Sequence, residues 1–198
     1  MGLERTLITL APILGAVGIV MAFGVLVSII RKPQGTEKMQ DISNQIHEGA
    51  MVFLRREYSI LIIFVAVVFL LLLWQLGINT ALAFLGGALC SLLAGFIGMQ
   101  AATKANVRTT EAARSEGPGV ALQVAFSGGV VMGLAVASLG LLGVGVVFWI
   151  FGGDPTTVSS INGFAMGASS IALFARVGGG IFTKTADIGA DLVGKLEA

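Results

Sequence analysis

Charged side chains are scarce in this sequence, and their scarcity limits the kinds of protein that it can encode. Only 12% of its 198 residues are Asp, Glu, Lys or Arg, whereas 56% are hydrophobic and the mean hydropathy is +0.93. Soluble domains carry about 25% charged residues, so a water-soluble fold is excluded and lipid must solvate most of the chain. The formal net charge of +1 also gives no electrostatic basis for binding nucleic acid.

Cysteine and histidine each occur once, which excludes a disulfide framework and a metal site built from Cys and His ligands. Cys90 lies inside an apolar run, and we expect it to be a small packed side chain. His47 lies in a polar segment beside Glu48, and we expect it to be solvated or locally hydrogen-bonded. Neither residue is a candidate for function.

Apolar runs long enough to cross a bilayer are abundant. A transmembrane helix needs about 20 apolar residues to cross about 30 Å of hydrocarbon. The sequence therefore predicts an all-α fold, a polytopic bundle of transmembrane helices that forms a single membrane domain over residues 1–198. Five spans are expected near residues 7–30, 59–76, 81–102, 120–151 and 158–175, and the last helix is expected to continue into the cytoplasm to about residue 195.

Between the spans, basic residues are confined to alternate connections. The first and third connections contain Arg31, Lys32, Lys38, Arg55, Arg56, Lys104, Arg108 and Arg114, whereas the other two contain only Asp154 as a charged residue. Cytoplasmic loops are enriched in Lys and Arg, so we expect the N-terminus outside and the segment after the fifth span in the cytoplasm. The two basic connections are also rich in helix-forming residues, and we expect the spans to continue through them as helices.

Glycine is frequent, with 28 residues, many of them inside the expected spans. Small residues let helix backbones approach closely in a membrane, so we assign these glycines to helix packing and not to chemistry. Gly178–Gly180 follow the fifth span directly, where they predict either a close helix contact or a local bend.

The segment RVGGGIFTKTADIGADLVGKLEA, from Arg176 to Ala198, concentrates charge after five nearly neutral spans. Its charged residues are Arg176, Lys184, Lys195, Asp187, Asp191 and Glu197. On a helix that turns about 100° per residue, the four charges from Lys184 to Lys195 fall within an arc of about 80°. They therefore share one face.

Two interpretations of this face remain open from the residues alone. In the first, the segment is a salt-bridged surface helix, because Asp191 and Lys195 have the favourable i, i+4 spacing. In the second, the like-charged pair Asp187 and Asp191 holds a divalent cation. Mg²⁺ is typically bound by one or two carboxylates together with phosphate oxygens and water, and flanking lysines suit the phosphate.

Arg176 lies eight residues before Lys184, which places it about 12 Å deeper along the same helix. Its side chain could reach back to the membrane interface. Alternatively, it faces the bundle interior and pairs with an acidic residue on an ion path.

The segment from Arg176 to Glu197 closely resembles the signature of the membrane-bound, ion-pumping pyrophosphatases. That signature reads R-V-G-G-G-[IV]-[FY]-T-K-A-A-D-x-x-A-D-L-V-G-K-x-E, and the clearest departure is Thr185, where alanine is usual. Resemblance extends to the segments RKPQGTEKMQDIS, GFIGMQAATKANVRTTEAAR and ALQVAFSGGVVMGL, so it covers essentially the whole chain.

The resemblance implies a homodimeric pump with a subunit of about 16 helices, which hydrolyses magnesium pyrophosphate on the cytoplasmic side and moves H⁺ or Na⁺ across the membrane. It implies Mg²⁺ as the cofactor and leaves K⁺ dependence open. By resemblance, the pyrophosphate ligands are Lys184 and Lys195, the Mg²⁺ ligands are Asp187 and Asp191, the ion-gate residue is Arg176, and Glu197 has an uncertain role.

Five spans are about a third of such a subunit. We therefore expect an N-terminal fragment or truncated product, located in a prokaryotic cell membrane, that contains no catalytic residue and is inactive by itself. The alternative hypothesis is a non-enzymatic membrane bundle or transporter module, in which the charged helix is a salt-bridged cytoplasmic anchor.

Overall fold

Five long α-helices make up nearly all of the computed structural model, which describes residues 2–152 and 157–196, with side chains from Leu10 onward. The helices are α1 (Gly2–Ile30), α2 (Glu37–Gln75), α3 (Ile78–Ser115), α4 (Pro118–Phe151) and α5 (Ile161–Leu196), and a short 3₁₀ helix, η1 (Val158–Ser160), precedes α5. Each of the five is long and apolar enough to cross a membrane, which confirms the predicted all-α polytopic fold.

The helices extend beyond the apolar runs from which they were predicted. α2 begins at Glu37 and α3 ends at Ser115, so both basic connections are largely helical, as their composition predicted. Thr36 caps α2 by accepting a hydrogen bond from the Met39 amide at 3.4 Å. α5 reaches Leu196, whereas Glu197 and Asp154 lie outside the described residues.

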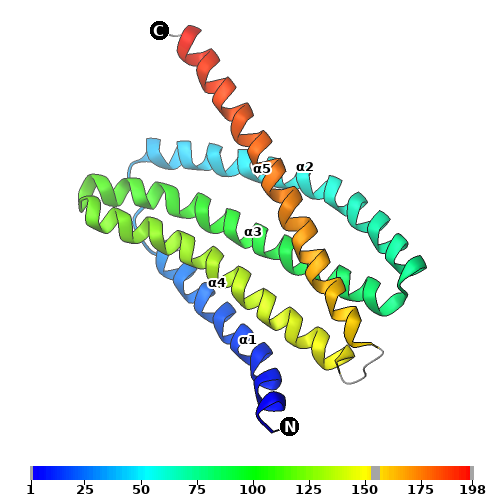
Figure 1. The fold of residues 1–198 in the computed structure, drawn as a ribbon. Helices are drawn as coiled ribbons and strands as arrows, with labels where there is room; N and C mark the ends of the chain where they lie inside the picture. Colours follow the sequence, from blue (N-terminus) through cyan, green and yellow to red (C-terminus); the bar gives the residue numbers. More distant parts are fainter. Residues whose placement is uncertain (1, 153–156, 197–198) are drawn as a thin grey trace.

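α3 is the central helix of the bundle (Figure 1). It packs against α4, α5 and α2, and α1 packs mainly against α4. Buried residues of α3 take part in each of the hydrophobic clusters, including Phe84, Ala83, Ala101 and Ala112. In Figure 1 the C-terminal half of α5 continues past the other helices into open space.

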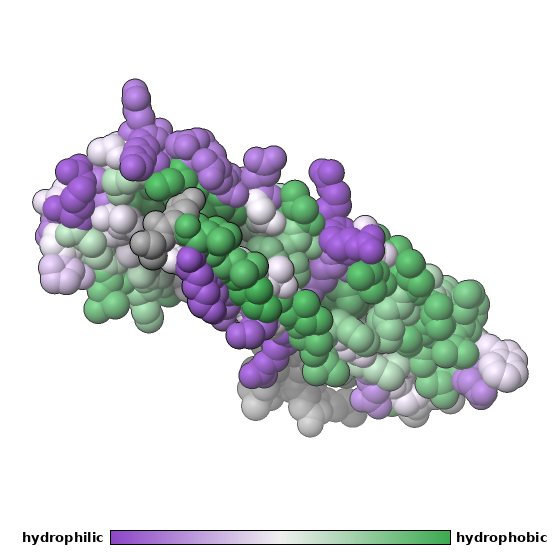
Figure 2. All heavy atoms as spheres, turned by 90° about the horizontal axis from the view of Figure 1, so that it is seen from above, coloured by the Kyte–Doolittle hydropathy of each residue, from purple (hydrophilic) through white to green (hydrophobic). Residues whose placement is uncertain are grey.

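Apolar side chains cover much of the face of the bundle seen in Figure 2, and hydrophilic side chains gather mainly toward one end of it. Trp74 is 79% exposed and Phe126 is 72% exposed, although both are large hydrophobic side chains. Exposed apolar surface on this scale is costly in water and natural in hydrocarbon. Together with the five candidate spans, it shows an integral membrane protein.

The closest helix contact joins α3 to α5, and it is reciprocal. A Cβ atom added to Gly87 would lie 2.9 Å from the Ala168 amide nitrogen and closer still to the Phe164 carbonyl oxygen. A Cβ atom added to Gly167 would meet the Phe84 carbonyl in the same way. Each helix therefore places backbone over the glycine of the other, which requires that both residues lack a side chain.

A buried cation joins the end of α1 to α3. Arg108 is only 5% exposed, and its Nη2 donates a hydrogen bond of 3.0 Å to the carbonyl of Ile30, the last residue of α1. Its Nη1 donates to the Lys104 carbonyl at 2.7 Å. A guanidinium at a helix C-terminus satisfies carbonyls that lack a partner within the helix and interacts favourably with the helix dipole.

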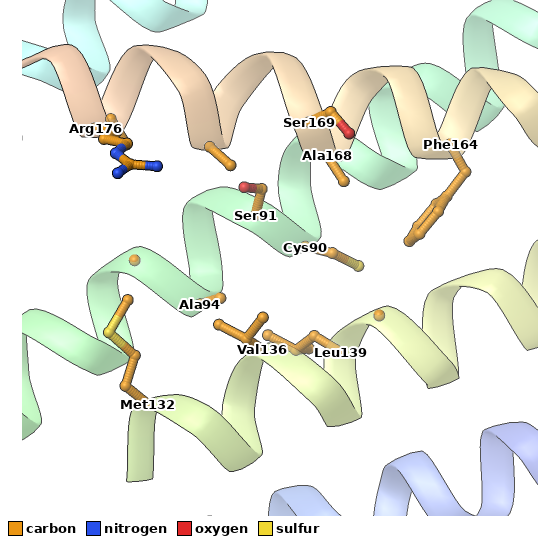
Figure 3. Close-up of a pocket in the computed structure, with 14 residues that line it drawn as sticks. Cys90, Ser91, Ala94, Met132, Val136, Leu139, Phe164, Ala168, Ser169 and Arg176 are labelled. Carbon is orange, nitrogen blue, oxygen red and sulfur yellow. The ribbon is translucent and has the colours of Figure 1, made fainter. Parts of the chain in front are cut away.

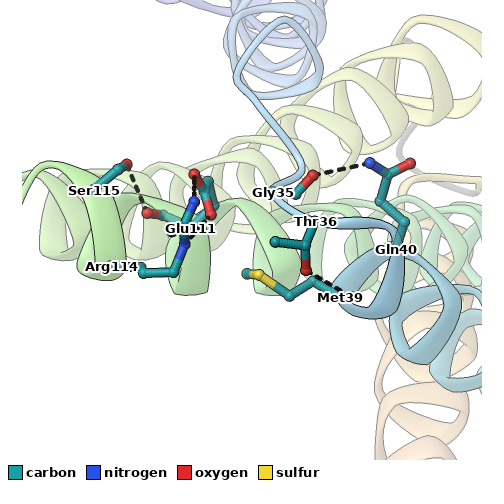
Figure 4. A network of polar contacts seen from close by, with 7 residues as sticks. All are labelled: Gly35, Thr36, Met39, Gln40, Glu111, Arg114 and Ser115. Carbon is teal, nitrogen blue, oxygen red and sulfur yellow. Dashed lines mark hydrogen bonds and ion pairs between the residues drawn. The ribbon is translucent and has the colours of Figure 1, made fainter.

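The connection from α1 to α2 crosses α3 beside an ion pair (Figure 4). Arg114 donates to both oxygens of Glu111, with distances of 2.9 Å and 2.8 Å. Gly35 has φ of +79°, and a Cβ atom there would lie 2.7 Å from Oε2 of Glu111. Only glycine suits this backbone conformation and this space.

We predict that Gly87→Ala destabilises the chain. The added methyl group collides with the α5 backbone, and overpacking of this kind costs about 1–3 kcal/mol. Thermal unfolding of the purified chain in detergent measures the effect. The matched control is Gly133→Ala, because a Cβ atom there meets nothing within 4 Å. Equal stability of the two variants would contradict the reciprocal contact.

We also predict that Arg114→Gln destabilises the chain at pH 7 and that this difference disappears in acid. Glu111 lies beyond the apolar run 81–102, and its hydrogen bonds from Arg114 lower its pKa below the usual 4.5. A carboxylate with a lowered pKa contributes stability above its unfolded-state pKa and loses it as the pH falls through its folded-state pKa. Unfolding temperatures of parent and Arg114→Gln should therefore converge below about pH 4.5. Arg55→Gln, at an exposed position, is the control. A difference that stays undiminished as the pH falls below 4.5 would disprove the linkage.

Candidate functional site

The charged segment is a regular helix whose side chains are open to solvent. α5 is continuous from Ile161 to Leu196, and every described residue from Ile181 onward is exposed. Lys184, Asp187, Asp191 and Lys195 therefore lie on one exposed face, as a helix with 3.6 residues per turn requires. The structure gives these side chains access to a soluble ligand.

The salt bridge required by the surface-helix interpretation does not form. Within residues 10–152 and 157–196, the single ion pair joins Arg114 to Glu111. Asp191 and Lys195 form no ion pair with each other. Asp187 and Asp191 thus lie one helical turn apart with like charges, and neither forms an ion pair with a Lys or Arg side chain of the described residues. Such a pair is unfavourable by itself and is stabilised by a bound cation.

The carboxylates fit a magnesium ion that shares its ligands with a phosphate. No group of three or more His, Cys, Asp or Glu side chains able to hold a metal occurs among the described residues. Mg²⁺ commonly uses only one or two carboxylates and completes its octahedron with water and substrate phosphate oxygens. The two aspartates suit this arrangement, and a cage built from protein ligands alone is not present in the described part of the chain.

Arg176 lies at one end of a groove between α3, α4 and α5 (Figure 3). The groove has a volume of about 540 Å³ and is lined mainly by apolar side chains, with the hydroxyls of Ser91 and Ser169 as polar exceptions. Figure 3 shows the guanidinium directed away from α5 toward the space above α3 and α4. No acidic residue lines the groove, so the acidic partner that sequence reasoning allowed for Arg176 is not supplied by the described residues.

Glu57, on α2, contacts the helix that carries the charged face, and sequence reasoning missed this contact. A Cβ atom added to Gly178 would lie 3.1 Å from Cδ of Glu57 and would overlap its Oε1. Gly179 and Gly180 have nothing within 4 Å, and α5 remains helical through all three glycines. The triple glycine therefore serves a close contact at Gly178. The sequence did contain a signal for this contact. At about 100° per residue, Phe53, Glu57 and Phe64 fall within an arc of about 40° around α2, so they share one face.

The two rare residue types lie elsewhere. Nδ1 of His47 is 2.9 Å from Oγ1 of Thr103, which is a contact between α2 and α3 and not the solvated or local interaction that was expected. Cys90 is partly buried and lines the same groove as Arg176 on the side of Phe164, consistent with a small packed side chain.

Comparison with known proteins identifies similar sequences. The family model described as inorganic H⁺ pyrophosphatase matches residues 16–198. Three relatives are 50%, 46% and 44% identical to the chain over 98%, 97% and 99% of its length. The first, from Clostridium tetani, is provisionally named a K⁺-stimulated pyrophosphate-energized sodium pump. The others, from Moorella thermoacetica and Methanosarcina mazei, are named K⁺-insensitive pyrophosphate-energized proton pumps.

These relatives are much longer than the chain. It spans 28% of the Clostridium protein and 29% of each of the other two. The similarity therefore covers nearly all of this sequence and less than a third of each pump.

Proposed function

Because this chain belongs to the inorganic H⁺ pyrophosphatase family, we propose that it forms one part of a membrane pump that hydrolyses pyrophosphate and moves H⁺ or Na⁺ across the membrane. The observation that carries the proposal is the exposed face of α5, with two aspartates one turn apart between two lysines. The length of the relatives supports the view that other segments complete the pump.

On this proposal, Lys184 and Lys195 bind the phosphate oxygens of pyrophosphate. Each lysine is an exposed ammonium group at one end of the charged face, where a compact positive charge attracts phosphate. They neutralise the negative charge that accumulates on the leaving phosphate, which is the main electrostatic demand of phosphoryl transfer.

Asp187 and Asp191 would hold Mg²⁺ together with the substrate. When bound, the ion supplies positive charge to the phosphate oxygens. The chain's own contribution is to fix the two carboxylates on a rigid helix at one-turn spacing. The four residues of this face are occupied in binding phosphate and Mg²⁺, so we expect the group that activates the attacking water to come from another segment and the chain alone to be inactive.

Arg176 would link hydrolysis to ion movement. α5 is one continuous helix, so a displacement of its phosphate-binding face also displaces Arg176, about 12 Å away along the helix. Arg176 lies at the end of an apolar groove whose described lining contains no acidic residue, and we propose that another part of the pump provides an acidic partner for it. A rigid element that responds to both sites is the physical basis of coupling.

The proposal also includes the orientation of the chain in the membrane and the assembly of the complete pump. The Lys and Arg residues between positions 31 and 56, in the α1–α2 connection and the first half of α2, and those between 104 and 114, at the end of α3, favour an orientation with the N-terminus outside and the charged face of α5 in the cytoplasm. We also propose a homodimer of the complete pump, in a prokaryotic cell membrane, as the family resemblance implies. The Clostridium relative is named as K⁺-stimulated and the other two as K⁺-insensitive, so the proposal leaves K⁺ dependence open.

The test of the proposal is a chimaera in which this chain replaces the matching 29% of the Moorella proton pump. We expect Mg²⁺-dependent release of phosphate from pyrophosphate and H⁺ uptake into vesicles. Lys184→Ala and Asp191→Ala should each lower the hydrolysis rate about 10²- to 10³-fold, the usual effect of removing one group that stabilises the transition-state charge. Lys32→Ala, at an exposed position outside the charged face of α5, should leave the hydrolysis rate unchanged.

Phosphate release from the 198-residue chain alone would contradict its expected inactivity and leave the pyrophosphatase function standing. A correctly inserted chimaera that is inactive, or one whose activity survives both substitutions, would favour the non-enzymatic membrane bundle.

We predict that Arg176→Ala in the active chimaera lowers the number of H⁺ ions moved per pyrophosphate. The guanidinium lies in the groove and away from the phosphate-binding face, so its loss should affect transport more than substrate affinity. Simultaneous measurement of H⁺ uptake and phosphate release gives the ratio. Normal pumping by this variant would remove Arg176 from the proposed ion gate.

A further inference from the structure

α2 and α5 meet along a narrow antiparallel seam of three contacts. The Phe53 and Phe182 rings have centroids 4.6 Å apart, and the Phe64 and Phe174 rings have centroids 4.5 Å apart. Between these aromatic pairs, the Glu57 side chain lies against Gly178. The successive α2 residues Phe53, Glu57 and Phe64 contact α5 at residues of decreasing number, as expected for antiparallel helices. Figure 1 shows α5 crossing α2.

The contact between Glu57 and Gly178 depends on steric fit and not on a hydrogen bond. The Glu57 carboxyl group occupies the space that the missing side chain of Gly178 leaves open. Its Oε1 is buried and has no hydrogen-bond partner among the described residues. We call the space beside Gly178 that Glu57 fills the notch. Burying an unpaired carboxylate oxygen is costly, so the notch favours the neutral form of the Glu57 carboxyl group. An amide of the same shape would fill it equally well.

The notch lies behind the proposed gate residue on the same helical turn. Arg176 is two residues before Gly178, which turns its side chain about 160° away around α5. Arg176 faces the groove with α3 and α4, whereas Gly178 faces α2. Lys184, the first residue of the phosphate-binding face, begins about 9 Å further along the helix. Glu57 therefore contacts α5 between the two regions that coupling must connect.

We infer that Glu57 is a positioning residue for the pump, which holds α5 at Gly178 and so sets the placement of Arg176 relative to the groove. This inference rests on the proposed function and adds to it a role for α2. Glu57 touches neither the pyrophosphate-binding face nor the groove, so it acts through α5. Its loss should reduce coupling and leave pyrophosphate binding intact.

The experiment uses the active chimaera and measures H⁺ uptake and phosphate release together. Glu57→Ala should lower the H⁺-to-pyrophosphate ratio about 2- to 30-fold, the range for residues that modulate coupling without touching a ligand. The KM for pyrophosphate should not change. Glu57→Gln should retain the parent ratio, because the amide keeps the shape of the carboxyl group.

Gly178→Ala tests the same contact from the α5 side. Its methyl group meets the end of a flexible side chain and not backbone, so the helices can stay folded while the Glu57 carboxyl group is displaced. We expect a fall in the ratio like that of Glu57→Ala, and the double variant should lose no more than either single variant. Gly179→Ala, where a Cβ atom meets nothing within 4 Å, is the matched control.

The outcomes separate this inference from the function on which it rests. An inactive parent chimaera overturns the proposed function, and the inference with it. An active parent with unchanged ratios in Glu57→Ala and Gly178→Ala overturns the inference alone. A loss in Glu57→Gln as large as that in Glu57→Ala also overturns it, because shape would then not explain the role.

Discussion

The whole arrangement depends on how closely α5 approaches α3. At Gly87 and Gly167 the two backbones touch without intervening side chains. This contact fixes the tilt and register of α5, and everything that α5 carries toward its C-terminus follows from that placement. In a membrane, hydrophobic burial does not distinguish one helix neighbour from another, so steric fit between small residues takes over this role. Phe84 and Phe164, which supply the facing carbonyls, complete the fit as buried side chains.

Two polar side chains join helices of the bundle by donating to backbone carbonyls. Arg108 satisfies the end of α1, and the Tyr58 hydroxyl donates to the Leu92 carbonyl at 2.6 Å to join α2 and α3. Buried polar groups are costly unless they are paired, and paired ones define a single arrangement of the helices. The charges of Lys184, Asp187, Asp191 and Lys195 are instead on the exposed part of α5, where solvent or a ligand can reach them.

Periodicity and length were sufficient to predict the helices, because a spanning segment must satisfy its own backbone and leaves a long apolar run. The same reasoning predicted that Lys184, Asp187, Asp191 and Lys195 share a face, since a helix fixes angles between its own residues. Contacts between helices were beyond this reasoning. His47 and Thr103 are 56 positions apart, and Glu57 and Gly178 lie on different helices, so only the packing brings them together. Sequence alone also left two uses for the triple glycine open, and the neighbour on α2 decided between them.

The separation of about 12 Å between Arg176 and Lys184 along α5 has an electrical consequence. The membrane potential falls across the hydrocarbon region and acts little on groups that project into the water beyond. Moving one elementary charge across this potential changes its energy by about 2.3 kcal/mol per 100 mV. On the proposed function, voltage would therefore oppose or assist the ion that passes Arg176 and hardly affect pyrophosphate on the projecting face. One straight helix would connect a chemical step outside the electric field to a transport step within it.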